Sequence, residues 1–271
     1  MNATIAALFV YPVKSCRGIA VSAARLTERG LARDREWMIV DADGRFVTQR
    51  EVPRLALVAP ALSDTMLQLA APGMAPLAIP LEWTGTPRSV TVWRDTLPAF
   101  DQGHAAATWL SAWVGHPVRL VRFDPEFRRQ CNPAFAGPGG AHTAFADAYP
   151  LLVLSEASLA DLNRRLDQPL PVDRFRPNLL LSGIEPYDED YIGELSIGAA
   201  TLTLVKPCTR CQITTTDQAT AQVGAEPLAT LARYRQNTML GSVTFGMNAV
   251  VTAGAGVSME SGASARCKLA F

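Results

Sequence analysis

Lys206-Pro207-Cys208-Thr209-Arg210-Cys211 is the stretch around which this 271-residue sequence is organised. Residues 200–205 form an apolar and β-branched run that predicts a strand leading into it. The residues that follow, Gln212-Ile213-Thr214-Thr215-Thr216, are again β-branched and favour a strand over a helix. We therefore expect the two cysteines to lie between two β segments.

A Cys-x-x-Cys pair serves several kinds of chemistry. Thiol–disulfide exchange of the thioredoxin type needs the first cysteine at a helix N-terminus, and the strand predicted after Cys211 disfavours it. A structural zinc site needs four ligands, usually as two pairs. The sequence has no second pair, and its histidines stand apart: His104, His116 and His142. A plant-type iron–sulfur run is also absent. Simple burial of two thiols stays an alternative.

Cationic side chains accompany the pair. Lys206 precedes the cysteines and Arg210 lies between them. Three more cations stand at the ends of predicted strands or in short loops: Lys14, Arg35 and Arg176. Taken singly, such residues are usually solvated at the surface. Together they suit a soft thiolate ligand for a redox metal within a cofactor that carries a phosphate.

The overall composition argues against several classes of function. Lys plus Arg and Asp plus Glu each number 25, so no net charge draws the chain to nucleic acid or to an anionic membrane. Residues 1–9 lack a basic start and are too short for a signal peptide or a membrane span, which predicts a cytoplasmic location. Five scattered cysteines do not form the framework of a secreted disulfide protein.

The first half of the sequence is expected to be mainly β. Short apolar runs between Gly- and Pro-bearing turns predict strands at 5–11, 19–26, 37–41, 45–48, 66–69, 78–81, 89–93 and 118–123. Ala42-Asp43-Gly44 predicts a hairpin between two of these strands. A helix is expected over residues 105–114, ending at Gly115. Residues 124–150 show no periodicity and predict a functional loop.

The second half is expected to mix strands and short helices. Strands are predicted at 151–154, 179–181, 200–205 and 243–251, the last being the final clear strand. Ser155 is expected to cap a helix, and Glu226-Pro227 to begin another. The chain length predicts two domains, residues 1–120 and 121–271. Residues 1–35 could pack with the second domain.

Six short motifs occur in one order over nearly the whole chain. They are Tyr11-Pro12-Val13-Lys14-Ser15-Cys16, Arg33-Asp34-Arg35, Leu154-Ser155-Glu156-Ala157-Ser158, Phe175-Arg176-Pro177-Asn178, Cys208-Thr209-Arg210-Cys211 and Phe245-Gly246. In this order they resemble the MOSC-domain molybdoenzymes, especially the mitochondrial amidoxime-reducing component and bacterial relatives that detoxify N-hydroxylated purines. The resemblance implies a mainly β (α+β) fold, with a MOSC β-barrel, peripheral helices and a β-rich N-terminal domain.

The resemblance also implies a role for each matching position. Cys211 corresponds to the cysteine that is both the catalytic residue and the protein ligand of molybdenum, and Cys208 to a neighbour that is not a ligand. Asp147 is followed by Ala148-Tyr149, where the family has small polar residues. The positions that correspond to contacts with the molybdenum cofactor, a pterin with a phosphate, are Lys14, Ser15, Arg35, Asp147, Arg176, Asn178, Thr209, Arg210 and Asn248.

The implied reaction is the reduction of small N-hydroxylated compounds, such as amidoximes, hydroxylamines and N-hydroxylated purines, to amines or amidines with release of water. No iron–sulfur cluster is expected in this chain, so electrons are expected from a separate flavin reductase, cytochrome or ferredoxin-like protein. Two alternatives stay open. One is a persulfide or sulfur carrier that uses Cys211 without molybdenum, and the other is a non-catalytic carrier of the cofactor.

Overall fold

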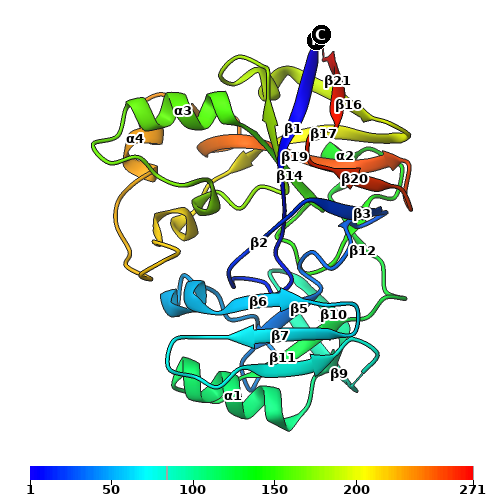
Figure 1. Cartoon of the computed structure of the whole chain (residues 1–271), viewed down its shortest axis with the longest axis vertical. Helices are drawn as coiled ribbons and strands as arrows, with labels where there is room; N and C mark the ends of the chain where they lie inside the picture. The colour runs from blue at the N-terminus through cyan, green and yellow to red at the C-terminus, as the bar shows by residue number, and fades with distance from the viewer. Residues whose placement is uncertain (84, 271) are drawn as a thin grey trace.

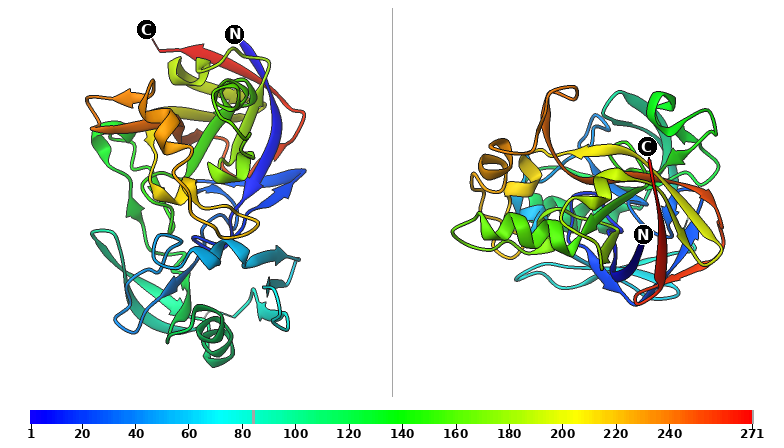
Figure 2. Two further views of the ribbon diagram at one scale, coloured as in Figure 1. Left: turned by 90° about the vertical axis from the view of Figure 1, so that its left-hand side faces the viewer. Right: turned by 90° about the horizontal axis from the view of Figure 1, so that it is seen from above.

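The structure is a computed structural model that describes residues 1–83 and 85–270. Figure 1 shows two β-rich parts, one above the other, with both chain termini at the far end of the upper part. The same arrangement is visible from the side in Figure 2, where the first and last strands run next to each other. The two parts meet at the segments that carry most of the predicted site residues.

The upper part is a closed β-barrel. Its strands, in spatial order, are β14 (Leu151–Ser155), β15 (Leu179–Ser182), β1 (Asn2–Val10), β21 (Ser264–Leu269), β16 (Ile192–Ile197), β17 (Ala200–Thr209) and β19 (Ser242–Ala253). Strand β19 pairs back onto β14, with Leu151 opposite Ala249, and this pairing closes the sheet. The first strand of the chain thus lies among strands of the second half. The expected mainly β fold with a barrel is confirmed.

The barrel interior explains why these segments form strands. Alternate residues of β17, Ala200, Leu202 and Leu204, are buried in one apolar core, as the period of two in a strand requires. Burial of each such leucine contributes about 1.5–3 kcal/mol. Gly246 has a φ of +76°, and a Cβ there would lie 2.7 Å from the carbonyl oxygen of Val153. Only glycine lets β19 pass β14 at this point.

Shorter elements surround the barrel. The additional strands are β2 (Ile19–Val21), β3 (Ala23–Thr27), β4 (Gly30–Leu31), β18 (Gln236–Asn237) and β20 (Ser258–Glu260). The peripheral helices are α3 (Glu156–Arg164) and α4 (Leu228–Ala232). Both were predicted, and Ser155 caps α3 by accepting a hydrogen bond from the Ser158 amide at 3.0 Å. None of the helices in the described residues is long and apolar enough to cross a membrane.

The lower part has its own sheets and cores. One sheet has the order β5 (Trp37–Val40), β11 (Arg119–Phe123), β10 (Asp95–Asp101) and β9 (Thr86–Val92), and another has β6 (Ala59–Leu62), β7 (Met66–Ala70) and β8 (Leu77–Pro80). Helix α1 (His104–Val114) packs Leu110 and Trp113 into the core between them. It ends at Gly115, which has a φ of +91°, so this predicted helix is also confirmed.

Several predicted strands are wrong in detail. Residues 45–48 do not form a regular strand, but they turn back onto β5 as predicted: Phe46 makes an antiparallel bridge to Val40, and the Val47 amide donates to the Ile39 carbonyl at 2.8 Å. Strand β11 pairs with the other edge of β5. Residues 19–26 form two strands with a break at Ser22. Strands β20 and β21 follow the strand expected to be the last, and β21 was missed because its inward residues include only the small Ala265 and Cys267.

The segment 124–150 is irregular, as its lack of periodicity predicted. It contains only β12 (Arg129–Gln130), α2 (Pro133–Ala136) and β13 (His142–Thr143). Further short 3₁₀ helices span Pro53–Leu57, Val172–Arg174, Asp188–Tyr191 and Gln212–Thr215. The last of these directly follows Cys211.

Candidate functional site

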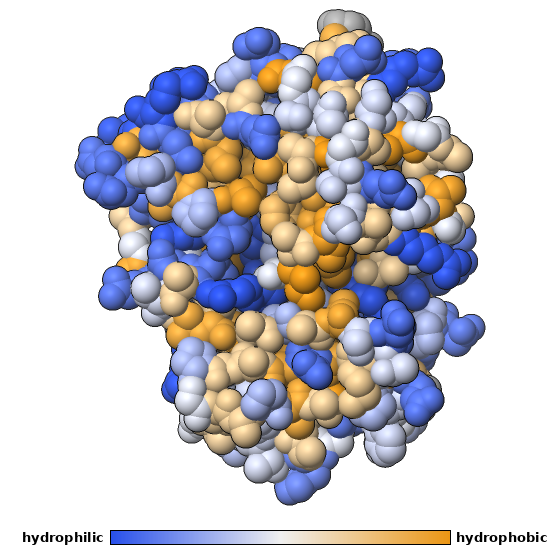
Figure 3. Space-filling view, viewed as in Figure 1, coloured by the Kyte–Doolittle hydropathy of each residue, from blue (hydrophilic) through white to orange (hydrophobic). Residues whose placement is uncertain are grey.

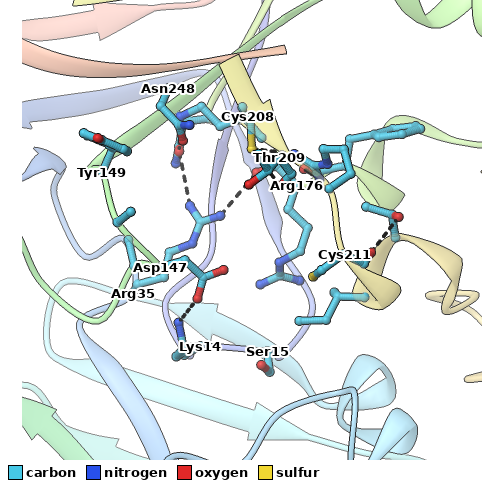
Figure 4. A pocket seen from close by; sticks show the side chains of 18 of the residues that line it. Lys14, Ser15, Arg35, Asp147, Tyr149, Arg176, Cys208, Thr209, Cys211 and Asn248 are labelled. Atoms are coloured by element: carbon cyan, nitrogen blue, oxygen red, sulfur yellow. Dashed lines mark hydrogen bonds and ion pairs between the residues drawn. The ribbon is translucent and has the colours of Figure 1, made fainter. Parts of the chain in front are cut away.

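A single pocket brings together every site residue that the sequence predicted (Figure 4). The pocket is open to solvent, and together with the solvent at its mouth it takes in about 830 Å³. In Figure 3, hydrophilic residues gather around a hollow at the level where the two parts of the molecule meet. The predicted residues that line the pocket are Lys14, Ser15, Arg35, Asp147, Arg176, Asn178, Thr209, Arg210, Cys211 and Asn248.

Barrel strands and the loops at their ends position these residues. Strand β17 ends at Thr209 and carries Cys208 to the pocket, while Asn248 lies on the neighbouring strand β19. Lys14 and Ser15 follow β1, Asp147 precedes β14, and Arg176 and Asn178 precede β15. The site therefore depends on pairing between strands that are far apart in the sequence.

The two cysteines have different surroundings. Cys208 is half-buried, and its Sγ accepts a hydrogen bond from Nη1 of Arg210 at 3.0 Å. The same guanidinium donates from Nη2 to the carbonyl oxygen of Phe175 at 2.7 Å. Cys211 is exposed and lines the pocket. Of the two thiols, Cys211 is the more accessible to a ligand in the pocket.

The prediction of a strand after Cys211 is wrong. Residues Gln212–Thr215 form a 3₁₀ helix, in which the hydroxyl of Thr214 donates to the Cys211 carbonyl at 2.9 Å. Such local bonds from threonine offer the backbone an alternative to a strand, despite the β-branched side chains. Thiol–disulfide exchange is nevertheless disfavoured on other grounds, since the first cysteine, Cys208, lies in strand β17 and not at a helix N-terminus.

The pocket is strongly cationic. Among its lining residues that the structure describes, Asp147 is the one acid, against five cations: Lys14, Arg35, Arg50, Arg176 and Arg210. Nζ of Lys14 donates to Oδ1 of Asp147 at 2.6 Å and to the carbonyl oxygen of Phe145 at 2.8 Å. Burial lowers the pKa of Lys14, although Asp147 opposes this shift. Such a pocket favours an anionic ligand.

Two arginines of the pocket enclose one aromatic ring. The guanidinium carbons of Arg35 and Arg176 lie 4.2 and 4.3 Å from the ring centre of Tyr11. The hydroxyl of Tyr11 donates to the carbonyl oxygen of Pro177 at 3.0 Å, and Arg35 donates to Oδ1 of Asn178 at 3.2 Å. Burial and the neighbouring Arg35 lower the pKa of Arg176 to about 10. These contacts hold two like charges side by side at the pocket.

Three of the predicted site residues have a left-handed backbone. The φ angles are +66° at Ser15, +46° at Arg35 and +57° at Arg176. Each such conformation costs a non-glycine residue about 1–3 kcal/mol, and such residues concentrate at functional sites. Their common location in one pocket is therefore a sign of function that is independent of the sequence motifs.

The family follows from comparison with known proteins. The MOSC N-terminal beta barrel domain matches residues 2–117, and the MOSC domain matches residues 140–262. Human mitochondrial amidoxime-reducing component 1 is 40% identical over 244 residues, which cover 86% of this chain and 72% of the human protein. This chain belongs to the amidoxime-reducing component family of MOSC-domain proteins.

A second member of the amidoxime-reducing component family gives a similar match. Mitochondrial amidoxime reducing component 2 from Rattus norvegicus is 35% identical over 244 residues and covers the same shares, 86% of this chain and 72% of the rat protein. Among solved structures, the YUAD protein from Bacillus subtilis aligns with 98% of this chain and 94% of its own, at 10% identity and a TM-score of 0.44.

Several pocket residues of this family member were not predicted. Arg50 and Thr48 line the pocket, and Gln49 between them is fully buried. Gln49 donates to the Ser15 carbonyl at 2.7 Å and to Oε1 of Gln218 at 3.1 Å. It thus joins the Ser15 turn to the segment after the cysteines. No local pattern marks this role, because the partners of Gln49 lie far away along the chain.

Proposed function

We propose that this chain is a molybdenum cofactor-dependent reductase of N-hydroxylated compounds, with the Cys211 thiolate as the protein ligand of the metal. The observation that carries the proposal is the exposed thiol of Cys211 on the wall of a pocket with five cations and one acid among its described residues. A soft thiolate suits molybdenum, and the cations suit the phosphate of the pterin. Membership of the amidoxime-reducing component family supports the reaction class.

The donors in the pocket fit an anionic, oxygen-rich cofactor. Nε of Arg210 is buried and has no hydrogen-bond partner within residues 1–83 and 85–270. An unpaired buried donor is costly, so a bound ligand that accepts a hydrogen bond there would remove the penalty.

The residues of the pocket divide into groups by chemistry. Lys14, Arg35 and Arg176 would bind the phosphate, since they supply positive charge from a mostly buried position. Asn178 and Asn248 offer amides, and Ser15 and Thr209 offer hydroxyls, for the polar edges of the pterin. Partial burial shields these interactions from salt, so binding should persist at moderate ionic strength.

When bound, the cofactor supplies the two-electron reduction that converts an N–OH group to N–H with release of water. The protein residues hold the cofactor at Cys211 and leave the open side of the pocket for the substrate. We further propose that the electrons come from a separate flavin reductase, cytochrome or ferredoxin-like protein. The substrates are small molecules that carry an N–OH group, such as amidoximes and N-hydroxylated purines.

The proposal is tested with protein made in a host that synthesises the cofactor. Dithionite-reduced viologen donates electrons anaerobically, and the loss of benzamidoxime and hydroxylaminopurine is followed together with the amine products. We expect turnover of both compounds by a protein that contains molybdenum. Bound molybdenum without turnover would instead identify a cofactor carrier. Absence of molybdenum, with persulfide on Cys211, would identify a sulfur carrier.

A further inference from the structure

The turn between β9 and β10 has an unusual residue at its first position. Val92 pairs with Asp95, so only Trp93 and Arg94 connect the two strands. Trp93 has a φ of +56°. Glycine is the usual residue where a two-residue hairpin turn begins with a positive φ, because a side chain there is strained. The bulky indole is therefore held in an unfavourable conformation.

The indole of Trp93 reaches the wall of the pocket. Its Nε1 donates a hydrogen bond to Oδ1 of Asp147 at 3.0 Å, and Nζ of Lys14 donates to the same oxygen at 2.6 Å. The ring packs against Phe46 at 5.1 Å between ring centres, and the guanidinium of Arg50 lies 4.5 Å from the ring centre of Trp93. Trp93 is still 46% exposed, so burial alone does not explain its presence.

The same turn holds the segment before Asp147 by a second contact. Asp95 accepts a hydrogen bond from Nε of Arg129 at 2.7 Å. Arg129 is buried and donates to the carbonyl oxygens of Ala144, Ala146 and Asp147 at 3.0, 2.5 and 3.2 Å. The turn thus fixes both the backbone and the carboxylate of Asp147.

These contacts leave one oxygen of Asp147 available. Within the described part of the chain, Oδ2 accepts no hydrogen bond, and the side chain is 61% exposed. Figure 4 shows the carboxylate with one oxygen on Lys14 and the other directed toward the interior of the pocket. A carboxylate repels an anionic cofactor, whereas it attracts N–H donors. A substrate with an amino group is the natural partner of this oxygen.

We propose that Trp93 is a positioning residue that, together with Lys14, fixes Asp147 so that its free oxygen accepts a hydrogen bond from an amino group next to the N–OH group of the substrate. The inference rests on the proposed function and names its preferred substrates. Amidoximes and N-hydroxylated amidine-like rings carry such an N–H group, whereas simple N-alkylhydroxylamines do not carry a second nitrogen.

The test compares Trp93→Phe, Trp93→Gly and the control Arg94→Ala from the same turn. Both Trp93 variants remove the indole donor, and glycine also removes the strain. For both, we expect KM for benzamidoxime to rise about tenfold, as for loss of one hydrogen bond to a charged group. The KM for an N-alkylhydroxylamine should change less than about twofold, and molybdenum content should stay constant. Circular dichroism should show the wild-type fold for both Trp93 variants.

Each other result counts against the inference. It is overturned if KM for benzamidoxime is unchanged in both Trp93 variants, or if KM rises equally for both substrates. Arg94→Ala should match wild type in every measurement. A wild-type protein that reduces neither substrate overturns the proposed function itself. An active wild type with unaffected Trp93 variants overturns only the role of Trp93.

Discussion

Arg210 donates a hydrogen bond to Sγ of Cys208 at 3.0 Å, and this contact makes the two cysteines of the Cys-x-x-Cys run inequivalent. Cys208 is half-buried beside its cationic neighbour, whereas Cys211 is exposed on the pocket wall. The Cys-x-x-Cys spacing alone does not distinguish the two thiols. In the structure Cys211 is the more exposed of the two thiols, and its role as the metal ligand is our proposal.

Alkylation should distinguish the thiols in cofactor-free protein. At about pH 8, iodoacetamide should modify Cys211 first, since it is exposed. Cys16 and Cys131 should resist until the protein unfolds, because burial raises the pKa of Cys16 to about 12 and that of Cys131 to about 11. Peptide mass spectrometry over time gives the order. Modification of Cys16 as fast as Cys211 would refute this prediction.

Stability should fall in alkaline solution. The pKa of Cys16 is raised to about 12 in the folded protein, from 9.0 for the free thiol. The unfolded chain therefore loses this proton first, and the free energy of unfolding should decrease between about pH 9 and pH 12, by about 1 kcal/mol at pH 10. Urea denaturation at several pH values measures the slope. The Cys16→Ala variant should have a smaller slope, and an equal slope would contradict the assignment.

Arg176 should be needed for retention of the cofactor. Replacing it with alanine removes a guanidinium that is held by the Cys16 carbonyl at 2.7 Å and stacked on Tyr11. Loss of one charge-assisted contact, about 1.5–3 kcal/mol, should weaken cofactor binding about tenfold or more. Pterin fluorescence per protein, before and after dialysis in high salt, measures retention. The exposed Arg164 provides the control, and equal retention in Arg164→Ala and Arg176→Ala would exclude this role.

Gln49 should contribute mainly to stability. Its side chain bonds the Ser15 carbonyl and exchanges two hydrogen bonds with Gln218, and all of these groups are buried. Gln49→Ala would leave buried polar groups unpaired, at a cost of about 1–3 kcal/mol for each. The Tm should drop by several degrees, whereas Gln68→Ala on an exposed position of β7 should have no effect. Equal Tm values for the two variants would count against the network.

The sequence predicted the parts of the site that lie in short contiguous motifs. Lys14, Arg35, Arg176 and Cys211 belong to such motifs, and the structure places them in one pocket. The helix caps were predictable for the same reason, since Ser155 and Gly115 act on adjacent residues. Features that depend on residues adjacent in the sequence can therefore be predicted from it.

Other features depend on contacts between distant segments. Gln49 and Gln218 are 169 positions apart, and Trp93 is 54 positions from Asp147. No periodicity marks such pairs before the chain is folded. The prediction of a strand after Cys211 failed for a different reason. The hydrogen bond from the Thr214 hydroxyl to the backbone outweighs the strand preference of the β-branched side chain. Intrinsic strand propensity takes no account of such a hydrogen bond between side chain and backbone.

The most direct test of the central claim is the molybdenum content of three proteins purified from one cofactor-producing host: wild type, Cys208→Ser and Cys211→Ser. Each is assayed on the same day for benzamidoxime reduction, and circular dichroism confirms the fold. We predict about one molybdenum per wild-type chain, no reduction by Cys211→Ser, and partial activity in Cys208→Ser. Wild type without stoichiometric molybdenum, or equally mild losses in both variants, would contradict the assignment of Cys211 as the metal ligand.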